Sequence, residues 1–83
     1  MRRVDPVTGL VLVLQGEGNL HVLSPRGEPV RDIAPPEGFA FSHFAGPGAV
    51  LVCRGDREID GWRDWQFEID AAAGTLRRAG PAW

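Results

Sequence analysis

The sequence predicts an all-β protein made of two related antiparallel meanders of three to four strands each. Short apolar runs alternate with turns rich in Gly and Pro, and no stretch keeps a helical period for more than one turn. The run Trp65–Ile69 alternates apolar and polar side chains, which is the period of a strand with one solvated face. The two halves of the chain also repeat the same order of segments. Together these observations favour sheets without substantial helix.

Length and composition limit the classes of protein that fit. The 83 residues suit a single domain, 1–83, and the net charge of −2 is spread over interspersed acidic and basic residues. No basic cluster suggests nucleic acid, and no apolar run approaches the ~20 residues of a membrane-spanning helix. The lone Cys53, the absence of Lys and the lack of a signal-like start predict a cytoplasmic, bacterial protein.

The first half reads as a hairpin followed by a weaker strand. The run 10–15 is apolar on both faces, so we expect it to be central or covered on both sides. Pro29 lacks a backbone donor, which places the third strand at a sheet edge. The expected elements are a short leading strand at 2–4, a turn at 5–9, strands at 10–15, 20–24 and 29–33, and a hairpin connection at 16–19.

The segment Ala34–Gly38 separates the halves because its two prolines exclude helix. We expect strands at 39–44, 49–53, 65–69 and 75–79, about seven in all, and a long charged loop at 54–64. In the first of these strands, alternation places Phe39, Phe41 and His43 on one face and Phe44 on the other.

The halves align as repeats. Val11–Glu17 matches Val50–Asp56, and Val30–Pro35 matches Leu76–Pro81, so repeat 1 covers about 1–36 and repeat 2 about 37–83. Each repeat, with four antiparallel strands in about forty residues, resembles one blade of a β-propeller. The resemblance is generic: the Trp-Asp and Gly-His signatures are absent, and no family's functional residues carry over to this chain.

Two such blades do not close a ring, which leaves three arrangements open. The halves can pack on each other as a sandwich or small barrel. Two chains can share their sheets as a dimer. Several copies can complete a propeller by oligomerisation, as small two-blade lectins do.

The charged loop is the main excess of the second repeat, since the hairpin connection 16–19 of the first repeat has four residues and its counterpart 55–66 has twelve. Added loops on a scaffold often carry function. An exposed Trp ringed by charges is typical of a protein interface. We therefore expect a small non-enzymatic protein-interaction module, in a concrete version an immunity or antitoxin-type inhibitor of one protein partner. The candidate partner-binding residues are Arg54, Asp56, Asp60, Trp62, Arg63 and Asp64.

Two other functions stay open. Carbohydrate or small-ligand binding would use an oligomeric propeller-like assembly with Trp as a platform. A small hydrolase could use Ser42 or Ser24 with His43, although no nucleophile elbow surrounds either serine. The loop partly mimics a calcium loop, but Phe67 stands where the bidentate Glu is required. The sequence thus indicates no catalytic residues, no metal and no cofactor.

Overall fold

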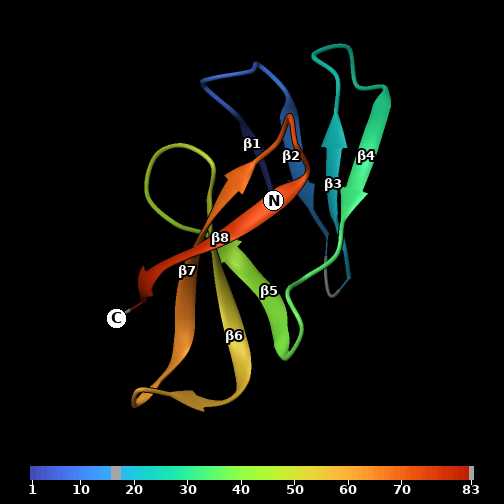
Figure 1. Ribbon diagram of the computed structural model, residues 1–83. Coiled ribbons are helices and arrows are strands. Elements are labelled where there is room, and N and C mark those ends of the chain that lie inside the picture. Colours follow the sequence, from blue (N-terminus) through green and yellow to red (C-terminus); the bar gives the residue numbers. More distant parts are fainter. Residues whose placement is uncertain (16–17, 83) are drawn as a thin grey trace.

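The computed structural model describes residues 1–15 and 18–82, and these form two four-stranded antiparallel sheets (Figure 1). In each sheet the strands lie in chain order, so each strand is joined to its neighbour by a direct up-and-down connection. The predicted fold class is confirmed. The first sheet contains β1 (Arg2–Val4), β2 (Val11–Leu14), β3 (Leu20–Leu23) and β4 (Pro29–Ile33). The second contains β5 (Phe39–Phe44), β6 (Val50–Ile59), β7 (Trp62–Asp70) and β8 (Thr75–Pro81).

The short leading strand is present as β1, which pairs with β2 and brings the described strands to eight. The turn that follows it is held by the buried Asp5. Its carboxylate accepts hydrogen bonds from the Thr8 hydroxyl at 2.6 Å and the Val7 amide at 3.2 Å, the short-range pattern typical of Asx turns. Pro29 does lie in an edge strand, as expected. The predicted connection at 16–19 falls partly outside the described residues, because Gly16 and Glu17 are not among them.

One prediction about facing is wrong, and a β-bulge is the reason. The register of β5 against β6 shifts between Phe41 and His43, so Ser42 has no partner of its own. An extra residue in a strand reverses the alternation beyond it. As a result Phe44, not His43, joins Phe39 and Phe41 at the core.

The two sheets pack face to face over one apolar cluster, and we call the surfaces that meet there the inner faces. Burying a side chain the size of Leu stabilises a fold by about 1.5–3 kcal/mol, so this shared cluster is the main source of stability. Phe39 and Phe67 contact edge to face, with ring centroids 5.2 Å apart. The cluster comprises Leu12, Leu14, Leu20, Val22 and Ile33 of the first sheet and Phe41, Leu51, Cys53, Trp65, Phe67, Ile69 and Ala71 of the second sheet and the turn after β7.

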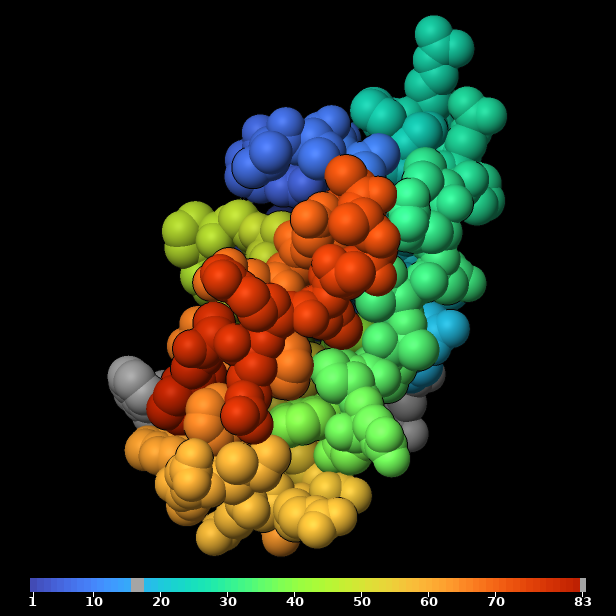
Figure 2. Space-filling view, in the orientation of Figure 1, coloured from blue at the N-terminus to red at the C-terminus, as the bar shows by residue number. Residues whose placement is uncertain are grey.

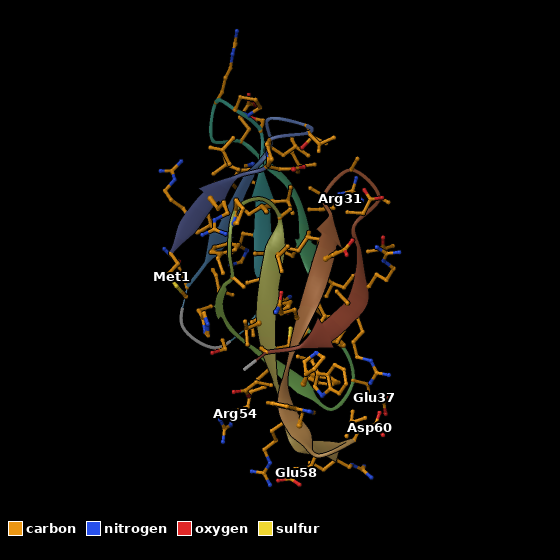
Figure 3. All side chains as sticks on the ribbon, turned by 90° about the vertical axis from the view of Figure 1, so that its left-hand side faces the viewer. Met1, Arg31, Glu37, Arg54, Glu58 and Asp60 are labelled. Carbon is orange, nitrogen blue, oxygen red and sulfur yellow. The ribbon has the colours of Figure 1, made fainter. Side chains whose placement is uncertain are left out.

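Two arginines of the first sheet reach across to turns of the second. Arg3 in β1 donates to the backbone carbonyls of the β5–β6 connection: Ala45 at 3.1 Å, Gly48 at 3.3 Å and also Gly46. Its guanidinium also lies 5.1 Å from the centre of the Phe44 ring. Arg31 in β4 lies against Gly74 of the β7–β8 turn. Figure 3 shows Arg31 beside this turn. The sheets are thus joined at both edges of the first sheet.

The sheets are not closed into a barrel, because each keeps its own two edge strands. Of the single-chain arrangements that the sequence left open, the structure has the sandwich. The described residues contain no helix, and so none that could cross a bilayer.

Candidate protein-binding arm

The stretch predicted as a charged loop is a two-stranded hairpin. β6 continues to Ile59 and β7 begins at Trp62, and these two residues are paired across a two-residue turn. Asp60 and Gly61 in the turn have φ of 51° and 84°, the left-handed values of a tight hairpin turn of the Asp-Gly kind. The loop prediction over 54–64 is therefore wrong in its conformation. We call residues 54–64 the hairpin arm.

The hairpin arm extends past its neighbours in the second sheet. The pairing of β5 with β6 ends at Phe39 and Gly55, and the pairing of β8 with β7 ends at Pro81 and Trp65. Figures 1 and 2 show the far end of the arm projecting at the end of the molecule away from the first sheet. The molecule is elongated, 41 Å long and 21 Å across.

A β-bulge shapes the base of the arm and explains why sequence reasoning ended the strand early. The pairing of β6 with β7 is irregular between Arg54 and Ile59, and Gly55 is buried there. A glycine inside a charged stretch usually predicts the start of a loop. The signal that could have found the hairpin is Asp60-Gly61 between Ile59 and Trp62, the strongest short hairpin signature.

The charged candidates on the arm are largely arranged in local pairs. Arg54 and Asp64 are cross-strand partners at the base, with Nη1 and Oδ1 3.7 Å apart. The nearest oxygen of Asp64 is shielded from solvent and accepts no hydrogen bond among the described residues. Farther out, Arg57 Nε lies 3.7 Å from the carboxylate of Asp56. Exposed pairs of this kind contribute about 0–1 kcal/mol to stability, so the fold does not depend on them.

Trp62 is the large apolar side chain of the arm. It is 41 % exposed, and its backbone carbonyl accepts a hydrogen bond from the indole of Trp65 at 3.1 Å. Trp65 has a different role: it is 8 % exposed, belongs to the core as predicted, and carries the Arg78 guanidinium 4.7 Å from its ring centre. Trp83 lies outside the described residues.

The structure places the six predicted residues on one arm but not on one patch. Arg54 and Asp64 lie at the base, whereas Asp56, Asp60, Trp62 and Arg63 follow toward the tip. Figure 3 shows Glu58 and Asp60 near the tip, with Glu37 from the preceding segment on the same end of the molecule.

Sequence reasoning missed a hollow beside the arm. It has a volume of about 300 Å³ and lies between Gly38 and Phe39 on one side and Gly55, Asp56 and Ile59 on the other. The Asp56 amide donates to the Gly38 carbonyl at 2.9 Å and joins the two sides. No local signal links these segments, because they are brought together only by the pairing of β5 with β6.

The other polar groups of the fold are less suited to binding a ligand, because their partners lie within the fold. A wider groove of about 650 Å³ lies at the opposite end of the second sheet, but its Glu68 and Arg77 are paired at 2.6 Å and its Asp5 is satisfied by the β1–β2 turn. Across residues 1–15 and 18–82, no three His, Cys, Asp or Glu side chains are placed to hold a metal ion.

The serine–histidine hypothesis finds two of its members in contact. The Ser42 hydroxyl lies 2.9 Å from His43 Nδ1 at the bulge in β5, on the exposed surface. In the described part of the chain, no carboxylate is hydrogen-bonded to this imidazole, and a Ser-His-Asp triad needs one to orient it. The other histidine, His21, pairs with Asp32 at 2.7 Å across β3 and β4.

No protein-family model, curated protein or solved structure matches this chain.

Proposed function

We propose that this protein is a small non-enzymatic interaction module that binds one protein partner through the hairpin arm. An immunity-type inhibitor, which covers a functional surface of its target, is the concrete form of this proposal. The observation that carries it is the arm itself, which projects from the sandwich and presents the partly exposed Trp62 among charged residues.

The energetics of the arm support this assignment. Its outer part adds one partly buried side chain, Ile59, to the shared cluster, so the core of the fold gains little from it. A two-stranded hairpin is marginal when it stands alone in water. A partner that packs on the arm would bury its aromatic side chain and complete the hollow beside Phe39 and Ile59.

The charges of the arm would serve a different step of binding. Surface pairs such as Arg54–Asp64 and Arg57–Asp56 are exposed, so they can exchange partners at an interface. Charges at an interface rim mainly raise the association rate and choose the partner, whereas a buried aromatic anchor slows dissociation. This predicts a salt-dependent association rate together with a dissociation rate set by Trp62.

The test is capture of the partner from lysate of the native host, followed by binding kinetics with the purified pair. Trp62→Ala should weaken the complex by about thirtyfold or more, mainly through faster dissociation, because anchors of this kind contribute at least ~2 kcal/mol. Val7→Ala is the matched control, since Val7 is 88 % exposed at the other end of the molecule. It should bind like the wild type.

Thermal unfolding of the same variants separates binding from folding. We expect Trp62→Ala to keep the wild-type melting temperature within a few degrees. An unfolded variant would reassign Trp62 to the core, and a folded variant with full affinity would place the partner elsewhere.

A second candidate function is ligand binding by an oligomeric propeller-like assembly. The observation that favours it is that each sheet is a four-stranded meander in chain order, the organisation of a propeller blade. It requires a trimer or larger in solution and a change in Trp fluorescence on adding sugars. A monomeric or dimeric mass would count against it.

A further inference from the structure

The two outer faces of the sandwich differ in chemistry. Outward-facing side chains of the second sheet include Arg54, Asp64, Gln66, Glu68 and Arg77, several of them in pairs. Val50 and Val52 share these rows, so the second sheet also turns two valines outward, but the first sheet turns outward a row that is apolar throughout. Arg3, Leu12 and Val22 point to the second sheet, so the residues that alternate with them must face away.

The cross-strand register arranges the outer face of the first sheet in two rows. One row is apolar throughout: Val4, Val11, Leu23 and Pro29. The next row is charged at both ends: Arg2, Val13, His21 and Asp32. Val4 and Pro29 at the two ends of the first row are exposed, Val4 to 59 %, whereas Leu23 is half-buried and Val11 is already buried at 5 %. A strand that is apolar on both faces, as β2 is, is typical of sheets covered on both sides.

We propose that a second copy of this chain covers this face, as a symmetric dimer whose two-fold axis runs parallel to the strands. Such an axis reverses the order of strands across the interface, so β1 of one copy lies over β4 of the other. The apolar row then meets an apolar row. The charged row meets itself in reverse, which places Arg2 opposite Asp32 of the other copy at both ends.

This arrangement fits the face better than a head-to-tail ring. A ring would press the valines of the first sheet against the outer face of the second, where the exposed Glu68–Arg77 pair lies. Charged groups lose their hydration when covered by apolar side chains and regain nothing there. A symmetric contact matches each patch with its own complement.

Solution mass tests the dimer directly. Light scattering and native mass spectrometry over a range of concentrations should show a dimer of the 9.0 kDa chain. Val4→Lys should make the protein monomeric, because it buries a charge in the apolar row, opposite Pro29 of the other copy. Val7→Lys is the matched control: it adds the same charge in the β1–β2 turn, outside the rows, and should remain dimeric.

A charge exchange tests the axis. Arg2→Asp and Asp32→Arg should each weaken the homodimer by about tenfold, since each variant sets like charges against each other twice. Mixing the two variants should restore a heterodimer of wild-type affinity, because both contacts then pair opposite charges. Within one chain Arg2 and Asp32 lie on opposite edge strands, three strand spacings or about 14 Å apart, so no internal contact can produce this rescue.

A monomer at every concentration, a trimer or larger ring, or a mixture that fails to form the heterodimer would each overturn the proposal. The dimer face and the hairpin arm lie on different sheets. Partner binding by Val4→Lys therefore reports on the arm separately.

Discussion

At the scale of single residues, the buried thiol of Cys53 shows how the core controls chemistry. The side chain is fully buried in the shared cluster, and this burial raises the pKa of the thiol to about 12. A thiolate is the reactive form of cysteine, so Cys53 behaves as a small apolar side chain, as its apolar sequence surroundings indicate.

The raised pKa predicts a loss of stability in alkali. In the unfolded chain the thiol ionises near pH 9.0, whereas in the folded chain it stays protonated to about pH 12. Between these values unfolding releases a proton, so stability present below pH 9 is lost as pH rises. The loss should reach about 1.4 kcal/mol by pH 10. Denaturant titrations of the wild type and Cys53→Ala measure it, and only the wild type should show this component.

At the scale of elements, the base of the hairpin arm depends on Gly55. A Cβ at this position would lie 2.9 Å from the Arg57 carbonyl oxygen and 3.1 Å from that of Arg63. Both are backbone atoms, which cannot move aside as a flexible side chain can. The absence of a side chain lets β6 and β7 approach closely where their pairing is irregular, and so sets where the arm leaves the sheet.

Gly55→Ala should therefore destabilise the protein by about 1–3 kcal/mol, the usual cost of forcing an atom into a filled site. Gly80→Ala is the matched control, because Gly80 is also in a strand of the second sheet and has open space around its Cβ position. It should be close to neutral. Equal midpoints for the two variants in urea would contradict the account of the bulge.

At the scale of the whole molecule, the two sheets depend on each other. One cluster contains side chains from both, and Arg3 joins the edge of the first sheet to a turn of the second. A single four-stranded sheet of this size would leave its inner face in water, so the halves are not independent units of folding.

Arg3→Ala should lower the free energy of unfolding by about 1.5 kcal/mol, at the lower end for hydrogen bonds to a charged group because Arg3 is only half-buried. Arg26→Ala removes an exposed arginine from the β3–β4 turn and should change the midpoint little. If Arg3→Lys proves as stable as the wild type, then the hydrogen bonds to the three backbone carbonyls and the contact with the Phe44 ring do not require a guanidinium group.

The amino-acid sequence by itself determined the strands and their division into two meanders. The alternation of Trp65, Phe67 and Ile69, the edge position of Pro29 and the break at Ala34–Gly38 are local signals, because they depend on side-chain period and backbone freedom. The composition also marked 54–64 as surface and Cys53 as core; Cys53 is fully buried, and 54–64 is exposed or half-buried except for Gly55.

Tertiary structure decided what local signals do not encode. The bulge at Ser42 exchanged His43 for Phe44 in the core, and the pairing of β6 with β7 turned a predicted loop into a projecting arm. The hollow beside Phe39 and the apolar row on the outer face of the first sheet exist only because particular strands pair in a particular register. The physical reason is the same in each case: pairing register depends on the partner strand, and the partner is distant in the chain.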